Sequence, residues 1–121
     1  MNKSPYIVIQ STQPPYSSSC SIDALEAALA ATNIGLEVMF IFVGEGVYQL
    51  LDKQENSAIC HKSTFKKLKA LPLFDIDKIF ALHSSLIEHS VSLPIQMPNI
   101  SAISDTELID YCKQANHVLV F

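Results

Sequence analysis

Three cysteines carry the thiols with which this chain could do sulfur chemistry. Cys20 lies at the predicted start of a helix over residues 21–32, where backbone N–H groups and the helix dipole stabilise a thiolate. Such a thiol could accept sulfur, although a small side chain is also ordinary at a junction between a loop and a helix. Cys60 beside His61 is far short of a metal site, and Cys112 is expected to pack as a small apolar side chain.

A second group of polar side chains follows the predicted strands. His83 comes directly after a strand expected over residues 78–82, and Ser84 opens the helical turn after it. Parallel α/β sheets bind ligands at the carboxyl ends of their strands, where helix amides can hold an anion. Glu45 and Tyr48 also follow a strand and could line the same crevice. The main expectation is that His83 caps a helix or contacts another subunit and that the 45–51 helix forms a subunit contact. The alternative is that these four residues line a small-anion pocket.

The residue content argues against several other chemistries. With only three glycines and no Gly-x-Gly-x-x-Gly or P-loop motif, no dinucleotide cofactor is expected. The absence of a Cys-x-x-Cys pair gives no indication of a zinc ribbon or disulfide framework, and we expect neither a cofactor nor a metal. The net charge is −4 and the eight basic residues are all lysine. Without arginine, the bidentate contacts typical of phosphate and base recognition cannot form, so no direct binding of nucleic acid is expected.

Alternating strands and helices must position these side chains. The helix over 21–32 has apolar residues at helical spacing, and Gly35 is expected to follow its end in a left-handed conformation. The other expected elements are strands over 5–10, 36–43, 78–82 and 117–121, short helices over 45–51, 63–71 and 83–90, a helix over 106–114 capped by Ser104 or Asp105, and an irregular segment or short edge strand over 93–100.

This order indicates an α/β fold in which helices cover both faces of a mostly parallel sheet. The expected architecture is a flavodoxin-like three-layer sandwich, as one domain over residues 1–121. Hydrophobic residues make up 49% and charged residues 17%, so part of the apolar surface is expected to face another subunit. The longest apolar run, 38–43, is well below the ~20 residues that span a bilayer. No signal-peptide pattern is present, and we expect a cytoplasmic protein without membrane contact.

Several segments resemble the TusC/DsrF family in their order and spacing. The most specific is Gly46-Val47-Tyr48-Gln49-Leu50-Leu51, directly after the second predicted strand. Weaker matches are Ser11-Thr12-x-Pro14 after the first strand, Asp23-Ala24-Leu25-x-Ala27 in the helix, Leu73-Phe74-Asp75-Ile76 before the third strand, and an apolar last strand ending in Phe121. Since these matches run along nearly the whole length, the chain resembles a TusC/DsrF-like subunit of the DsrE/DsrF/DsrH (TusBCD-type) sulfur-relay family.

The resemblance implies a DsrE/F-like fold and a heterohexamer with DsrE/TusD-type and DsrH/TusB-type subunits. The family's complexes carry persulfide sulfur either toward 2-thiouridine at the tRNA wobble position or in intracellular sulfur oxidation. The resemblance also implies that the relay cysteine belongs to the DsrE/TusD-type subunit, near the end of the third core strand. Leu82 or a neighbour occupies that place here, and a leucine cannot carry a persulfide.

We therefore expect a non-catalytic scaffold subunit that supports tRNA thiolation and passes sulfur to a downstream carrier through the complex. Val47, Tyr48 and Phe74 are the expected partner-interface residues. Three alternatives stay open: a subunit of a sulfur-oxidation complex, a sulfur acceptor that uses Cys20, and a stand-alone homo-oligomer that binds a small anion near His83.

Overall fold

A computed structural model describes residues 5–13, 20–50, 70–93 and 99–121 of the chain. Along the chain its elements are β1 (Tyr6–Ser11), α1 (Cys20–Asn33), β2 (Glu37–Phe42), the 3-10 helices η1 (Gly44–Leu50) and η2 (Leu71–Phe74), β3 (Lys78–Leu82), α3 (His83–Glu88), β4 (Ile100–Ile103), α4 (Asp105–Gln114) and β5 (His117–Val120).

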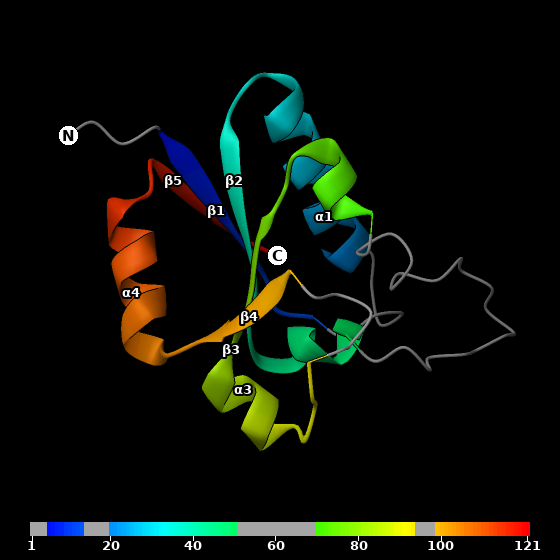
Figure 1. Cartoon of the computed structure of the whole chain (residues 1–121), viewed down its shortest axis with the longest axis vertical. Helices are drawn as coiled ribbons and strands as arrows, with labels where there is room; N and C mark the ends of the chain where they lie inside the picture. The colour runs from blue at the N-terminus through cyan, green and yellow to red at the C-terminus, as the bar shows by residue number, and fades with distance from the viewer. Residues whose placement is uncertain (1–4, 14–19, 51–69, 94–98) are drawn as a thin grey trace, which may run out of the picture.

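The five strands form one sheet in the order β4-β3-β2-β1-β5, and every neighbouring pair is parallel (Figure 1). Parallel pairing requires a crossover between consecutive strands, which α1 supplies between β1 and β2 and α4 between β4 and β5. Since all strands run the same way, their carboxyl ends meet at one edge of the sheet. We call this the carboxyl edge and the opposite one the amino edge.

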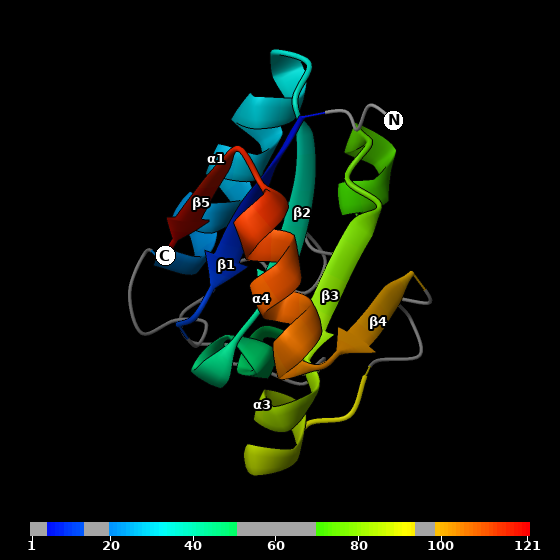
Figure 2. The ribbon, with the colours of Figure 1, turned by 90° about the vertical axis from the view of Figure 1, so that its left-hand side faces the viewer.

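Helices cover the sheet on both faces, which confirms the predicted α/β sandwich. Helix α1 packs on one face, and α4 crosses in front of β1 and β2 on the other (Figures 1 and 2). The central strand β2 is therefore buried on both faces, and this explains its unbroken apolar run. Phe40 and Phe42 point to the α1 side with ring centroids 5.2 Å apart, whereas Met39 and Ile41 belong to the cluster on the α4 side.

Two helix ends follow from local sequence signals. Ser104 caps α4: its hydroxyl accepts from the Glu107 backbone N–H at 3.1 Å, while the Glu107 carboxylate accepts from the Ser104 backbone N–H at 2.9 Å. This reciprocal pair satisfies two N–H groups that the helix itself leaves unpaired. After α1, Gly35 has a φ of +87°, the left-handed conformation expected beyond a helix end.

Two expected elements differ from the structure. The short edge strand lies at Ile100–Ile103, so it overlaps the segment expected over 93–100 only at residue 100. Its pattern has buried ends and two exposed small residues, Ser101 and Ala102, which gave no strand signal. Most of the helix expected over 63–71 lies outside the described residues, and Leu71 instead begins η2.

Large apolar side chains remain exposed over the part of the chain that the structure describes. The most exposed are Leu73 at 83%, Ile34 at 75% and Ile87 at 65%, and the edge strand β5 exposes all four of its residues. An edge strand with apolar residues on both faces is unusual for a monomer, because its unpaired backbone can join another chain. No helix of the described residues is long and apolar enough to cross a membrane.

Candidate functional site

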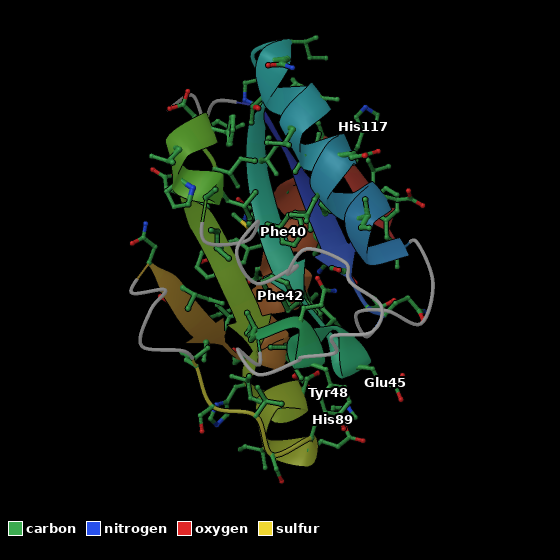
Figure 3. All side chains as sticks on the ribbon, turned by 90° about the vertical axis from the view of Figure 1, so that its right-hand side faces the viewer. Phe40, Phe42, Glu45, Tyr48, His89 and His117 are labelled. Atoms are coloured by element: carbon green, nitrogen blue, oxygen red, sulfur yellow. The ribbon has the colours of Figure 1, made fainter. Side chains whose placement is uncertain are left out.

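The carboxyl edge of the sheet brings together polar residues from three segments that are distant in the sequence. The end of β1 leads into Ser11–Gln13, β2 leads into η1, and β3 leads into α3. Figure 3 shows η1 and α3 stacked below the end of the sheet. This is the place where open parallel sheets bind ligands, so we treat it as the candidate site.

Gln49 is the central polar residue of this edge. Its side chain is 1% exposed, and its amide Nε2 donates to Ser11 Oγ at 2.6 Å and to the Gln13 carbonyl oxygen at 3.0 Å. Because a backbone carbonyl can only accept, these bonds fix the orientation of the amide. The other amide atom, Oε1, is buried without a hydrogen-bond partner among the described residues. Gln49 therefore ties η1 to the segment that leaves β1.

Gly46 allows η1 to lie directly against the end of β1. A Cβ atom at this position would overlap the carbonyl carbon and oxygen of Ser11. That same carbonyl oxygen accepts from the Val43 backbone N–H at 3.1 Å, so it cannot move away freely. The glycine is thus required for a close backbone approach and not for a special φ.

Helix α3 is joined to the start of η1 by Ser85. This side chain is buried, and its hydroxyl accepts from the Gly44 backbone N–H at 2.8 Å. Gly44 has a φ of +60°, which turns the chain sharply out of β2. The three segments of the candidate site are consequently connected to one another by Gln49 and Ser85.

Tyr48 contacts a histidine, but not the one that the sequence suggested. Its hydroxyl lies 3.1 Å from His89 Nδ1, and the two rings meet edge to face with centroids 5.0 Å apart (Figure 3). His83 is exposed at the first position of α3. His89 lies six residues further along, directly after the last residue of α3, and its ring faces Tyr48 of η1.

The remaining predicted residues are spread over the structure. Glu45 and Ser84 are exposed, and the Ser84 hydroxyl donates to Asp105 Oδ1 at 2.9 Å. Val47 is fully buried in the cluster on the α1 side, so its side chain faces the core and cannot meet a partner. Phe74 is 51% exposed at the end of η2, which precedes β3 and so lies toward the amino edge.

The cysteines differ in what the structure describes of them. Helix α1 begins at Cys20, as expected, while the Cys20 side chain and all of Cys60 and His61 lie outside the described residues. Cys112 is half-buried against the cluster on the α4 side, and its Sγ accepts from Gln10 Nε2 at 3.3 Å. The expectation that Cys112 packs as a small apolar side chain is thus confirmed.

The described side chains of the carboxyl edge offer hydroxyl, amide and imidazole groups. Within the described ranges, no group of three or more His, Cys, Asp or Glu side chains could hold a metal ion. Sequence reasoning gave Ser11, Gln49 and His89 no role of their own in the site. The usable signal was a glutamine among apolar residues in the segment 46–51, because a polar side chain in such a setting must have internal partners.

Removal of the Gln49 amide should loosen this edge. We expect Gln49→Met to lower the free energy of unfolding by about 1–2 kcal/mol, because the buried Ser11 hydroxyl and the partly buried Gln13 carbonyl lose their donor. Urea denaturation would measure the loss. Gln10→Met is the matched control, since Gln10 is less buried and its amide donates to the sulfur of Cys112. If Gln49→Met and Ser11→Ala proved strictly additive in a double mutant, the 2.6 Å bond would not contribute to stability.

Comparisons with known proteins agree with this architecture. The sequence model of the DsrE/DsrF-like family matches residues 6–121. The solved structure of the YchN protein from E. coli superimposes on this chain with a TM-score of 0.82. The superposition covers 97% of this chain and 99% of that one, and the two sequences are 18% identical. At that identity the likeness shows the fold.

Curated relatives cover most of the chain. A TusC homolog from Vibrio parahaemolyticus is 32% identical over 107 residues, which is 88% of this chain and 91% of that protein. A TusC homolog from Aliivibrio fischeri is 27% identical over 88% of this chain and 91% of its own length. A TusC homolog from Pseudomonas aeruginosa is 28% identical over 93% of this chain and 95% of its own length. With a family model that spans nearly all of its residues and a relative above 30% identity, this chain belongs to the DsrE/DsrF-like family.

Proposed function

We propose that this chain is a non-catalytic subunit of a sulfur-relay complex, in which it shapes the surroundings of a partner's persulfide. The partners would be DsrE/TusD-type and DsrH/TusB-type subunits in a cytoplasmic heterohexamer, and the product would be 2-thiouridine at the tRNA wobble position. Membership of the family and the similarity to TusC homologs support this proposal.

The observation that carries the proposal is the residue at the end of β3. In the resemblance stated above, the relay cysteine of the sibling subunit occupies this place. Here β3 ends at Leu82, 8% exposed, and α3 begins with His83. Neither side chain can carry a sulfane sulfur. The carboxyl edge is instead occupied by hydrogen bonds that connect its segments, as expected of a subunit that supports a neighbour's chemistry.

Exposed apolar surface supports the assembly part of the proposal. Phe74 and Leu73 protrude together from η2, at 51% and 83% exposure. Burial of such side chains against a partner stabilises association, and aromatic residues contribute most at interfaces. We therefore retain Phe74 and the half-buried Tyr48 as proposed interface residues and drop Val47.

The test is co-expression of this chain with its DsrE-type and DsrH-type siblings, followed by native mass spectrometry. A complex containing all three chains is expected. Phe74→Ala should weaken it at least tenfold without a change in the fold of the free chain, since a buried interface aromatic contributes about 2 kcal/mol or more. Ile87→Ala on α3 is the control at a different exposed apolar residue. A monomer that binds neither sibling would contradict the proposal.

The pathway is tested separately in cells of the source organism. Deletion of the gene should lower 2-thiouridine in tRNA, measured by mass spectrometry of nucleosides. An unchanged 2-thiouridine level with impaired oxidation of reduced sulfur would place the complex in sulfur oxidation instead.

One observation favours a second candidate, in which Cys20 accepts sulfur. The 14-residue helix α1 begins at Cys20, at the carboxyl edge, and a helix start stabilises a thiolate. The thiolate would attack the outer sulfur of a donor persulfide, the donor S–S bond would break, and the donor would leave as its thiolate. Persulfide-specific labelling should then disappear in Cys20→Ser and persist in Cys60→Ser and Cys112→Ser. Equal labelling of the three variants would eliminate this role for Cys20.

A further inference from the structure

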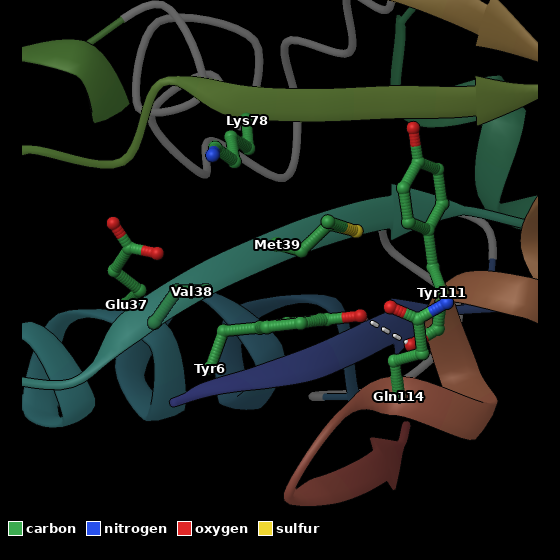
Figure 4. Close-up of a pocket in the computed structure, with 7 residues that line it drawn as sticks. All are labelled: Tyr6, Glu37, Val38, Met39, Lys78, Tyr111 and Gln114. Carbon is green, nitrogen blue, oxygen red and sulfur yellow. Dashed lines mark hydrogen bonds between the residues drawn. The ribbon is translucent and has the colours of Figure 1, made fainter. Parts of the chain in front are cut away.

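The amino edge of the sheet contains a cavity of 380 Å³ that the proposed function does not use. Seven residues from β1, β2, β3 and the end of α4 line it: Tyr6, Glu37, Val38, Met39, Lys78, Tyr111 and Gln114. Figure 4 shows the cavity between the ends of β1, β2 and β3 on one side and the last turn of α4 on the other. It lies at the end of the sheet opposite to η1 and α3.

One end of this cavity is apolar and held in place. The Tyr6 hydroxyl donates to the Tyr111 carbonyl oxygen at 2.7 Å, so the phenol of Tyr6 is anchored to α4. Burial raises the pKa of the Tyr6 phenol above its ordinary 10.0, with smaller contributions from Cys112 and Tyr111, and the hydroxyl therefore stays a neutral donor. Tyr111 stacks on Phe80 with centroids 5.4 Å apart, and the buried Met39 lies between the two tyrosines. These surfaces suit an aromatic or thioether group.

The other end carries one charge of each sign. Glu37 is the first residue of β2 and Lys78 the first of β3. Lys78 is in register with Met39, two residues beyond Glu37, so both side chains emerge on the α4 face of the sheet. Glu37 and Lys78 are exposed diagonal neighbours on adjacent strands, so a carboxylate and an ammonium line the same end of the cavity, where a ligand can reach both.

The size and the electrostatics narrow the class of ligand. Pockets for small molecules span roughly 300–1,000 Å³, so 380 Å³ fits an amino acid better than a nucleotide. Helix α4 ends at Gln114 beside the cavity, and the carbonyl end of a helix favours a cation. The carbonyl end of α4 and the Glu37 carboxylate would both repel a polyanion, whereas Lys78 supplies a single site for a carboxylate.

We propose that this cavity binds a small zwitterion with an apolar tail, namely a free α-amino acid with an aromatic or thioether side chain. Lys78 holds the carboxylate, Glu37 and the end of α4 hold the ammonium, and the side chain packs on Met39 between Tyr6 and Tyr111. This binding site is independent of the sulfur-relay role and stands if that role is disproved.

The experiment is a titration of the full chain with L-phenylalanine, followed by amide shifts in two-dimensional NMR. Shifts are expected at the lining residues, with a Kd of about 1 mM or lower. Two analogues separate the charges: 3-phenylpropionate lacks the ammonium and phenethylamine lacks the carboxylate. Each should bind the wild-type chain at least tenfold more weakly than L-phenylalanine.

Substitutions at two exposed residues identify which side chain binds each charged group of the ligand, without disturbing the core. Lys78→Gln should reduce the affinity for L-phenylalanine to that for phenethylamine, and Glu37→Gln should reduce it to that for 3-phenylpropionate. Asp77→Asn and Lys113→Gln are the matched controls, since neither lines the cavity, and both should bind like the wild type. The proposal is overturned if the lining residues do not shift, if the three ligands bind equally, or if neither Lys78→Gln nor Glu37→Gln weakens binding.

Discussion

Phe42→Ala is expected to lower the free energy of unfolding by about 3–5 kcal/mol, because it removes a large ring from a closely packed core. Phe42 is 0% exposed, stands at the last position of β2, and packs against Phe40. The cavity left behind would lie under the start of η1, where neighbouring backbone is held by the Val43–Ser11 and Gly44–Ser85 hydrogen bonds and can collapse only partly. Urea denaturation followed by circular dichroism would measure the loss.

Phe74→Ala is the control for this result, since it removes the same atoms from a side chain that is 51% exposed. A surface substitution of this kind should cost about 1 kcal/mol or less. The two variants therefore distinguish fold stability from assembly. Phe42→Ala should strongly destabilise the free chain, and Phe74→Ala should act mainly on the complex. Similar losses in the two free variants would mean that Phe74 is buried in solution and is no candidate for an interface.

Gly46→Ala is the second substitution with a large expected effect. A methyl group at this position would overlap the Ser11 carbonyl, so η1 or the end of β1 must move. Overpacking against backbone is harder to relieve than overpacking against a flexible side chain, and we expect a loss of about 3 kcal/mol or more. The same movement would break the Gln49–Ser11 bond and disturb the carboxyl edge, so binding to partner subunits should weaken as well.

Gly35→Ala provides the comparison for Gly46→Ala. Gly35 has a φ of +87° and open space around it, so an added methyl group meets no atom and costs only the conformational strain of about 1–2 kcal/mol. It also lies at the end of α1 away from η1, and partner binding should be unchanged. Thermal and urea unfolding of the two variants would rank them, and a larger loss for Gly35→Ala would show that η1 accommodates the methyl group.

The predicted role of this subunit depends on rigidity at the carboxyl edge. Gln49 joins η1 to the segment after β1, and Ser85 joins α3 to the turn after β2. Side chains that support chemistry on a neighbouring subunit must hold their positions, because small displacements of a reacting group cost rate. The hydrogen bonds of this edge are therefore consistent with a scaffold, and those of Gln49 join two segments that carry the family resemblance.

Local signals in the sequence determined most of the architecture. The strand Lys78–Leu82 lies where it was predicted, and the last strand and the helix before it differ by one residue at their ends. Apolar runs, a capping box and a glycine after a helix act over a few residues, so they can be read without the fold. The edge strand Ile100–Ile103 carries little such signal, and only its pairing with β3 makes it a strand.

The partners of the polar side chains were decided by the tertiary structure alone. Sequence order placed His83 at a strand end, but the direction in which a residue points from α3 depends on how that helix packs, and the packing presents His89 to Tyr48. Gln49 and Ser11 are 38 positions apart and meet because β1 and β2 are neighbours in the sheet. Whether Val47 faces a partner or the core depends on the same packing, because a helix as short as η1 has too few residues for an apolar pattern to show which of its faces is buried. Contacts between distant segments follow from the arrangement of the strands, which no local pattern encodes.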